Sequence, residues 1–371
     1  MPRIPLVLLA LLGLASSAGA GDLDLTLVAV GDVGLNRHRV NVHEDGMDLW
    51  GKRVPFDVMT RHIGRYLDGD INFCNLETVV TDRNDLPVTD KTYNFRTHPN
   101  AVKVLLKAGF NLFSTANNHV GDYGAEGITE TRKWLDAIGR KGRLHHAGAG
   151  RDEAEAATPA IFTVKGVRVA FAAVSIGVRA TKSRAGVIST HSPDPALKAL
   201  RDAKADLRIL SMHAGTERAL VPVAYQKTLA RRAISDFGVD VVIGHHPHVV
   251  QGIERYGNGL IFYSLGNFAL RGARNMGSDK ELRGTGDYGL LVRLDLRVNP
   301  RKGTVTFRRL EGVPVFDMHE GPHPFRKAAD AAARIEVLNR LSKAFSKKDP
   351  AVALEEKEGR FVYDFPSTDE P

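Results

Sequence analysis

The stretch VVIGHHPHVVQGIE, residues 241–254, joins an apolar run to three histidines that fall within four positions. The apolar run predicts a buried strand over residues 239–248 that ends on these histidines. Because a proline favours an extended conformation in the residue before it, Pro247 predicts an extended His246. Residues two apart on an extended chain face the same side, so we expect His246 and His248 to point into one site, each toward its own metal.

Outward from this stretch, short β-rich segments alternate with segments of helical periodicity. The predicted helices cover residues 99–110, 125–139, 195–204, 223–238 and 324–348. The predicted strands cover residues 23–32, 71–77, 111–119, 160–166, 167–174, 207–215, 239–248, 260–268, 288–298 and 304–316. Helix–strand alternation followed by strands that resemble an antiparallel meander predicts an α/β layered fold with mixed sheets.

Potential metal ligands stand at the ends of five predicted strands. In layered α/β folds, functional groups collect beyond the carboxyl ends of the strands. A single histidine at the end of a strand is usually a partly buried side chain with a hydrogen bond. Core packing, however, does not explain why five strands each end on an acidic, amide or imidazole side chain. These oxygen and nitrogen donors suit Zn²⁺, Mn²⁺ or Fe. The five endings are Asp32, Glu77, Asn118 with His119, His213, and His246 with His248.

The first twenty residues have the layout of a secretory signal peptide. Arg3 precedes an apolar run over residues 4–14, and small residues occupy positions 18–20. We expect cleavage after Ala20 and export of the mature protein. An uncleaved membrane anchor is the alternative, but the apolar run is shorter than the roughly 20 residues that a spanning helix needs.

Composition excludes several other classes of protein. The single cysteine, Cys74, rules out a disulfide framework. The net charge of +8 is mild, and no block of Lys and Arg interleaves with aromatic residues, so nucleic acid is not expected as a partner. An anionic polymer or a small acid is compatible with this charge.

Seven motifs in fixed order carry a family resemblance. From residue 25 to residue 268 the chain resembles the CapA-type poly-gamma-glutamate (capsule) synthesis family of the calcineurin-like metallophosphoesterase superfamily. The resemblance implies a four-layer α/β/β/α sandwich of two mixed β-sheets over residues 21–315, with a helical extension and flexible tail over residues 316–371. The motifs are VAVGDVGL, NLET, STANNHVGDYG, HHAGAG, SMHAGTE, IGHHPHVVQGIE and FYSLGNF.

The resemblance also implies roles for the strand-end residues in a two-metal centre. Asp32 and His248 match ligands of the first metal, and Glu77 stands where the superfamily has a bridging aspartate. His119 matches a general acid, or a group that holds the leaving oxygen, and His245 lies outside the ligand set. The residues that match ligands of the second metal are Asn118, His213 and His246.

One departure from the superfamily pattern affects the first metal. The superfamily continues Asp-x-His, whereas this chain has Gly34 two residues after Asp32, so an imidazole ligand is missing. Glu217 and Asp122 are candidates to fill that gap or to contact substrate. Arg96 and Arg179 are candidate contacts for substrate carboxylates, with solvated surface arginines as the alternative interpretation.

The implied activity is the synthesis, release or trimming of an anionic surface polymer such as poly-gamma-glutamate. Two divalent ions would share a hydroxide, and His119 would supply a proton to the departing group. This chemistry would serve a phosphoester as well as a γ-glutamyl amide, so both bonds stay open. Membrane-bound capsule synthesis subunits are the protein partners that the family leads us to expect.

Two alternatives come from other functional classes. Gly34 would suit a non-catalytic subunit that handles exported polymer without a filled first metal site. The stretch AVSIG, residues 173–177, nearly matches the nucleophile elbow of serine hydrolases, but Ala173 replaces the first glycine and Ser175 lies in an apolar strand.

Overall fold

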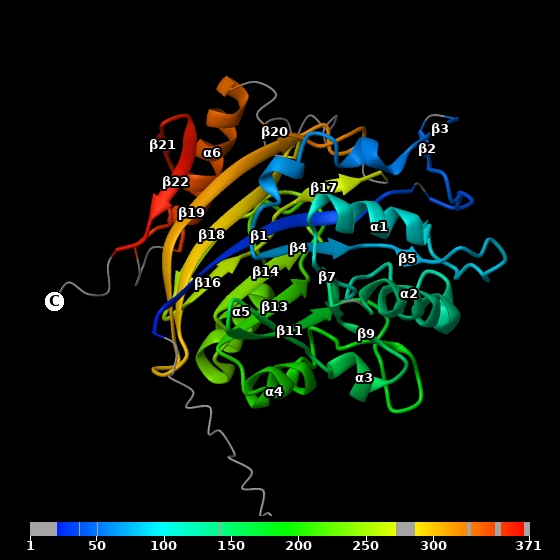
Figure 1. Ribbon diagram of the computed structural model, residues 1–371, viewed down its shortest axis with the longest axis horizontal. Helices are drawn as coiled ribbons and strands as arrows, with labels where there is room; N and C mark the ends of the chain where they lie inside the picture. Colours follow the sequence, from blue (N-terminus) through cyan, green and yellow to red (C-terminus); the bar gives the residue numbers. More distant parts are fainter. Residues whose placement is uncertain are drawn as a thin grey trace, which may run out of the picture.

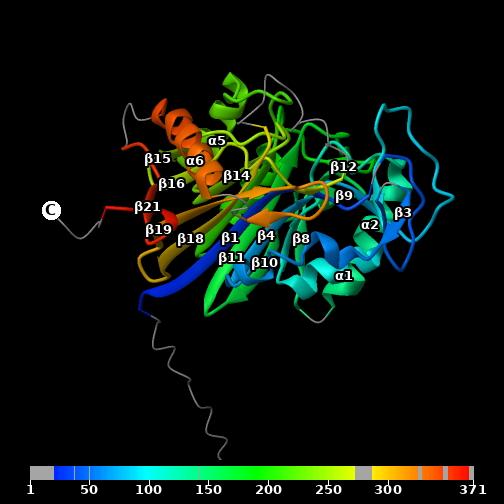
Figure 2. The ribbon, with the colours of Figure 1, turned by 90° about the horizontal axis from the view of Figure 1, so that it is seen from above.

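The computed structural model describes residues 21–36, 38–49, 51–140, 142–271, 286–324, 328–345 and 350–366. The predicted signal peptide and the last five residues of the predicted tail lie outside these ranges. Two large sheets dominate the described part of the chain, and they face one another (Figures 1 and 2).

The larger sheet is built around the long strand β1. In the order β21-β22-β19-β18-β1-β4-β7-β8, strand β1 pairs antiparallel with β18 and parallel with β4, and β7 and β8 continue the parallel half. Strand β17 pairs with the end of β1, and β20 pairs with β19. The strands are β1 (Leu23–Gly34), β4 (Ile71–Leu76), β7 (Leu112–Ser114), β8 (His145–Ala147), β17 (Asn267–Leu270), β18 (Gly289–Asn299), β19 (Thr304–Phe316), β20 (His323–Pro324), β21 (Glu355–Lys357) and β22 (Arg360–Asp364).

The smaller sheet has six strands in the order β10-β11-β13-β14-β16-β15. Its four central strands are parallel, and β10 and β15 pair antiparallel at the two edges. The strands are β10 (Ala160–Val164), β11 (Val167–Ser175), β13 (Leu207–His213), β14 (Val241–His245), β15 (Ile253–Tyr256) and β16 (Gly259–Phe262). Two-stranded ribbons are formed by β2 (Met47–Leu49) with β3 (Lys52–Val54), β5 (Val79–Val80) with β6 (Arg96–Thr97), and β9 (Ala149–Gly150) with β12 (Gly186–Val187).

Helices cover the outer faces of both sheets. Leu105 of α1 and Leu135 of α2 pack on the larger sheet, while Leu197 of α4 and Leu229 of α5 pack on the smaller one. These layers confirm the predicted α/β sandwich of two mixed sheets and agree with a four-layer arrangement (Figure 1). The helices are α1 (Pro99–Ala108), α2 (Gly124–Gly139), α3 (Glu153–Ala157), α4 (Asp194–Asp202), α5 (Ala224–Phe237) and α6 (Ala328–Lys343), with 3₁₀ turns η1 (Phe56–Met59) and η2 (Gly64–Tyr66).

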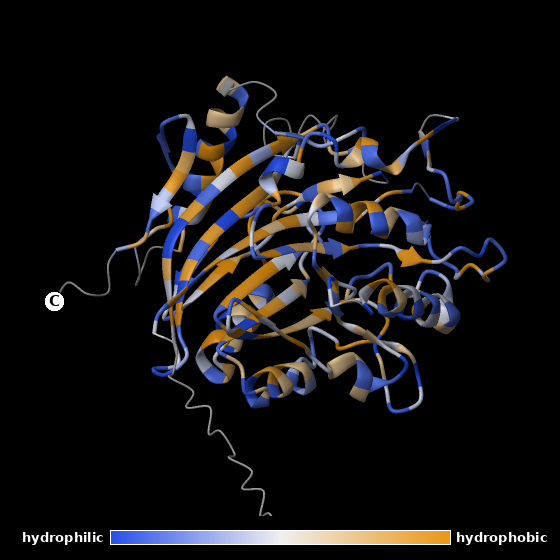
Figure 3. Ribbon diagram, viewed as in Figure 1, coloured by the Kyte–Doolittle hydropathy of each residue, from blue (hydrophilic) through white to orange (hydrophobic). Residues whose placement is uncertain are grey.

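The apolar character of the strands follows from burial on both faces. In β1, Leu27 joins the core between the sheets, whereas its neighbour Val28 joins the core under α1 and α2. Successive side chains of a strand point to opposite faces, so a strand covered on both sides is apolar throughout. Hydrophobic colour accordingly dominates the central strands, whereas β18 and β19, which are only partly buried on one face, show orange and blue segments (Figure 3).

Helix α6 covers one edge of the core that lies between the two sheets. It contacts β19 of the larger sheet and β15 of the smaller one, and it places Ala331, Ile335 and Leu338 in the shared core (Figures 1 and 2). The described part of the C-terminal extension is therefore packed against the sandwich. Among the described residues, no helix is both long enough and apolar enough to cross a membrane.

Three predicted strands differ from the observed ones. Strand β7 stops at Ser114 and β14 stops at His245, so the chain continues as loops through the residues that follow. The predicted strand over residues 260–268 is two strands: β16 belongs to the smaller sheet and β17 to the larger sheet. Both halves are buried and apolar, so periodicity alone did not show that the chain changes sheets near Gly266, whose φ is +69°.

At Gly266, where the chain passes from the smaller sheet to the larger one, the backbone packs closely against β1 next to Asp32. A Cβ atom added to Gly31 would lie 1.8 Å from the carbonyl oxygen of Gly266. That same oxygen accepts a hydrogen bond from the backbone N–H of Asp32, at 3.0 Å. Glycine at position 31 therefore allows the close approach that fixes the backbone of Asp32.

We predict that Gly31→Ala destabilises the protein by at least about 2 kcal/mol, because backbone atoms must move to admit the methyl group. Chemical denaturation measures the change. Gly64→Ala is the control, since an added Cβ there meets no atom within 4 Å; its effect should stay within about 0.5 kcal/mol. Equal stability losses in the two variants would contradict this account of the packing.

Candidate metal centre

The carboxyl ends of strands from both sheets meet at one place in the sandwich. In the larger sheet Asp32 belongs to β1 and Glu77 directly follows β4; in the smaller sheet His213 ends β13 and His245 ends β14. Since the paired strands are parallel, their ends lie at the same edge of each sheet. The Nδ1 atom of His245 lies 3.2 Å from Asp32 Oδ1 and so connects the two sheets.

Asp32 is fully buried and surrounded by nitrogen atoms. Its Oδ1 accepts a hydrogen bond from the Asn75 side-chain amide at 2.8 Å, and its Oδ2 lies 3.2 Å from His248 Nδ1. Burial alone would raise the pKa of Asp32, but the imidazoles of His245 and His248 beside it hold this pKa well below its ordinary value. Asp32 is therefore an ionised carboxylate at neutral pH.

Glu77 is buried in the middle of the cluster without a hydrogen-bond partner on either oxygen. Its Oε1 lies 3.5 Å from His213 Nε2 and 3.9 Å from the Nε2 atoms of His119 and His248. Burial, and next the charge of Asp32, raise the pKa of Glu77 well above its ordinary value. A buried carboxylate that protein atoms do not satisfy is suited to a cation.

His213 is held between two asparagine side chains. The Asn75 amide donates to His213 Nδ1 at 3.1 Å, and Nε2 lies 2.8 Å from the Asn118 side-chain oxygen. Burial and the charge of His246 lower the pKa of His213 well below its ordinary value, so the ring is neutral. A neutral imidazole is the form that binds a metal.

His246 and His248 lie on a bend after β14, and the expectation of an extended His246 is wrong. Their φ angles are +93° and +58°, which non-glycine residues adopt at a cost of about 1 to 3 kcal/mol each. The bend still directs both rings to the cluster: the His246 ring centre is 4.9 Å from that of His213. The preference imposed by Pro247 is overcome by this tertiary arrangement.

The two histidines differ in protonation. Burial, with the nearby His248, lowers the pKa of His246 to about 4, and its Nδ1 is buried without a partner. Burial acts in the same direction on His248, but the charges of Glu77 and Asp32 raise the pKa of His248 to about 10. His248 Nδ1 also lies 2.9 Å from the Asn267 side-chain oxygen.

Two groups of possible metal ligands follow from these positions. In each group one donor atom from every member lies within 4.8 Å of the others. The first group is Asp32, Glu77 and His213, and the second is Glu217, His246 and His248. The structure thus places the candidate Glu217 beside the histidine bend, and it places Asn118 against His213 of the first group.

Packing explains why no imidazole stands two residues after Asp32. Gly34 pairs with Leu270 of β17, and an added Cβ would lie 2.8 Å from the Leu270 side chain and 3.2 Å from the Glu77 carbonyl oxygen. A larger side chain at position 34 would disturb both strands. A further donor to an ion beside Asp32 would therefore come from another element.

His119 lies at the cluster with an acid behind it. Its Nδ1 is 2.7 Å from Asp122 Oδ2, which also accepts the Phe95 backbone N–H at 2.7 Å. Lys91 forms an ion pair with the other oxygen of Asp122. Burial lowers the pKa of His119 despite Asp122, so His119 is neutral with Nδ1–H held by the acid. Asp122, fully buried, positions His119 and is not exposed to substrate.

The candidate arginines and the alternative serine lie outside this cluster. The Arg96 side chain is buried and donates to the carbonyl oxygens of Val40 and Arg83, so it packs the protein instead of offering a free guanidinium. Arg179 is exposed and lies 4.0 Å from Glu153. Ser175 is buried and accepts the Gly177 N–H, and no described hydrogen bond joins it to a histidine.

Sequence reasoning missed several residues that shape the centre. Asn75 could have been found, because it lies two positions before Glu77 and shares its face of the strand. Asn267, in the motif FYSLGNF, could also have been singled out. Nothing in the sequence signalled that Lys91 would pair with Asp122, or that His245 would contact Asp32, because these pairs are distant along the chain.

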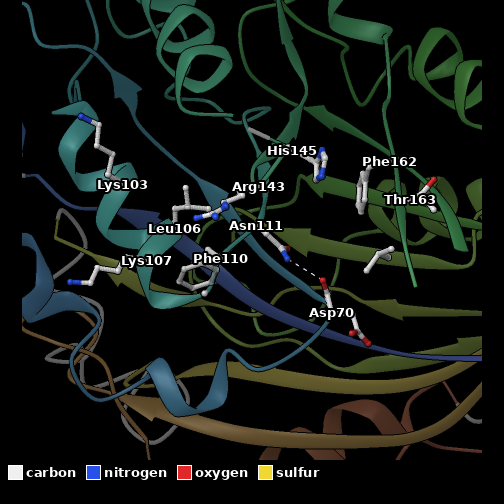
Figure 4. A pocket seen from close by; sticks show the side chains of 13 residues that line it. Asp70, Lys103, Leu106, Lys107, Phe110, Asn111, Arg143, His145, Phe162 and Thr163 are labelled. Carbon is white, nitrogen blue, oxygen red and sulfur yellow. Dashed lines mark hydrogen bonds between the residues drawn. The ribbon is translucent and has the colours of Figure 1, made fainter. Parts of the chain in front are cut away.

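A separate hollow of about 570 Å³ lies at the amino ends of parallel strands of the larger sheet, away from the candidate metal centre at their carboxyl ends (Figure 4). Asp70, Asn111 and Arg143, which line it, precede β4, β7 and β8. None of the predicted site residues lines this hollow.

Comparison with known proteins agrees with the motif order. The family model described as "Bacterial capsule synthesis protein PGA_cap" matches residues 26–271. The capsule biosynthesis protein CapA of Bacillus anthracis is 33% identical over 336 residues, which cover 87% of this chain and 74% of that protein. The PGA biosynthesis protein CapA of Bacillus subtilis is 33% identical over 303 residues, covering 80% of this chain and 72% of that protein.

A solved structure of a phosphatase from Mycoplasma pneumoniae aligns with 79% of this chain and 94% of its own, with 11% identity and a TM-score of 0.45. The family assignment rests on the sequence matches, which span most of the chain and include every strand end of the metal centre. This chain belongs to the bacterial capsule synthesis protein family PGA_cap.

Proposed function

We propose that this protein is exported and acts in the synthesis, release or trimming of a poly-gamma-glutamate capsule by metal-dependent hydrolysis of the polymer. Family membership and the names of the CapA relatives support the capsule role. The observation that carries the catalytic part is Glu77, whose buried carboxylate lies among three histidines without a hydrogen-bond partner.

The residues present fit divalent cations. Both Glu77 oxygens and His246 Nδ1 are buried without partners, and the donors are carboxylate, amide and imidazole groups suited to Mn²⁺, Zn²⁺ or Fe. We propose two ions. The residues that would hold them are Asp32, Glu77, Asn118, His213, His246 and His248.

The mechanism then follows from the groups around His119. Bound divalent ions would polarise the attacked group and lower the pKa of a water molecule. Asp122 holds the Nδ1–H of neutral His119, which leaves Nε2 toward Glu77 as a proton acceptor. His119 can therefore take up a proton at Nε2 and return it to the departing nitrogen of a γ-glutamyl amide.

A second candidate is a non-catalytic subunit that handles the polymer. Gly34 favours it, because β1 offers no second donor after Asp32. Metal-dependent phosphoester hydrolysis is a variant of the catalytic proposal with the same donors. Assays on poly-gamma-glutamate and on a phosphoester distinguish the two substrates.

We predict that Glu77→Gln separates metal binding from folding. In the chelated protein the variant should be as stable as the native chain or more stable, by up to about 3 kcal/mol, because a buried carboxylate without a partner is removed. In the metal-loaded protein it should bind less metal and lose the stabilisation that bound metal provides. Mass spectrometry for metal content and thermal unfolding, each with and without chelator, measure both effects.

Glu254→Gln is the matched control for this experiment. Glu254 is also buried, but its carboxylate pairs with Arg231 at 2.7 Å and accepts the Tyr263 hydroxyl at 2.6 Å. Its neutralisation should destabilise the protein equally with and without metal. Native protein without any metal, even after reloading, would refute the metal centre.

We predict that His119→Gln slows hydrolysis by about 10² to 10⁴-fold, since it removes the proton-transferring imidazole. Polymer length, followed by gel filtration with light scattering, measures the activity, and metal content should stay unchanged. The exposed His191 provides the control variant His191→Gln. Unchanged polymer length and yield with both His119→Gln and Glu77→Gln would support the handling subunit instead of hydrolysis.

Export is tested by the mature N-terminus. We predict that expression in a bacterium with a general secretion pathway yields a protein that begins at Gly21, as measured by intact mass. Ala20→Asp should block this cleavage because the processing site needs small residues. Secreted protein that retains Met1 would contradict the signal-peptide prediction.

A further inference from the structure

We propose that Glu217, His246 and His248 form an outer cation site, whose divalent ion exchanges with solvent faster than an ion held by Asp32, Glu77 and His213. This inference rests on the metal-dependent function proposed above. It adds Glu217 to the donors of the centre and places His246 and His248 on one ion instead of two. It also divides the centre into a labile ion and a retained ion.

The loop after β13 places Glu217 beside the histidine bend. The backbone N–H of Arg218 donates to the Pro247 carbonyl oxygen at 2.8 Å, between the two histidines. At the start of the loop, the Ala214 N–H donates to the His245 carbonyl oxygen at 3.0 Å. Glu217 is therefore carried by a loop that is bonded to the bend on both sides.

Two buried glutamines brace the same loop. Gln251 donates to the Ala219 carbonyl oxygen at 2.7 Å, and Gln226 donates to the Ala214 carbonyl oxygen at 2.8 Å. The backbone of Gly215 has a φ of +122° and packs against the Gln226 side chain. A Cβ atom added to Gly215 would lie 2.7 Å from the Gln226 amide. These contacts hold the loop, so Glu217 needs little ordering to act as a ligand.

Donor spacing fits one ion. One ligand atom each from Glu217, His246 and His248 lies within 4.8 Å of the others. An ion with bonds of roughly 2.0–2.2 Å holds its ligands roughly 3 to 4 Å apart, so modest side-chain rotations complete the site. His246 Nδ1, which is buried without a partner, is available for this purpose.

Exposure separates the two groups. Asp32, Glu77 and His213 are completely buried, whereas Glu217 is exposed and His246 and His248 are 6% and 8% exposed. An ion bound by the outer group therefore has a direct path to solvent, and a chelator can reach it first. The inner ion must pass the outer ligands or wait for the protein to open.

The experiment follows metal release from the full mature protein loaded with Mn²⁺ and freed of excess ion. After addition of EDTA, protein-bound manganese is measured over time by mass spectrometry. We expect two phases of about equal amplitude whose rates differ by at least tenfold. Glu217→Gln should lose the fast phase and about half of the bound manganese while it keeps the slow phase.

Two further variants complete the test. Glu320→Gln changes an exposed acid in a different loop and should leave both phases as in the native protein. Glu77→Gln should remove the slow phase. Two bound ions with release unaffected by Glu217→Gln, or release in a single phase, would overturn the outer site alone. A protein that binds no manganese would overturn this site together with the proposed metal-dependent function.

Discussion

The contact between Asp32 and the histidines of the smaller sheet is the constraint on which this site depends. Asp32 lies near the carboxyl end of β1 in the larger sheet. In the smaller sheet His245 ends β14 and His248 lies in the bend that follows, and both approach Asp32 to 3.2 Å. These contacts, with the Asn75 amide, satisfy Asp32 inside the protein. The sheets must therefore close on one another at this edge, and Gly31 and Gly34 are small because the chain is crowded there.

The burial of Glu77 without a hydrogen-bond partner indicates that the strand ends around Asp32 are not arranged for stability alone. Two carboxyl groups lie in one buried space, and of the two only Asp32 has hydrogen-bond partners. His246 and His248 add positive φ angles that ordinary side chains avoid. Backbone strain and an acid without hydrogen-bond partners in the same place agree with a site that could hold cations, since proteins tolerate such features mainly at functional sites.

Much of the fold could be predicted because its central strands are buried on both faces and form apolar runs in the sequence. The same property hid the change of sheets between β16 and β17, where apolar residues continue through the crossing. The strand-end donors were visible because each follows an apolar run. The conformation of His246 was not, since the contacts of the bend outweigh the local effect of Pro247. Arg96 could not be distinguished from a surface arginine before its acceptors, Val40 and Arg83, were known.

If the proposed metal centre is catalytic, the choice of substrate would come from groups beyond Asp32, Glu77 and His213. Asp122 holds Nδ1 of His119 and leaves Nε2 toward Glu77. Under the proposed mechanism this imidazole would serve the hydrolysis of an amide or of a phosphoester equally. The carboxylate and imidazole donors likewise serve either bond. Glu217 differs from the inner group, because it is exposed while it lies beside His246 and His248. An anionic polymer would be repelled by a bare Glu217 and attracted once a divalent cation neutralises that carboxylate. Occupation of the outer site would thus couple metal binding to polymer binding at the entrance of the centre.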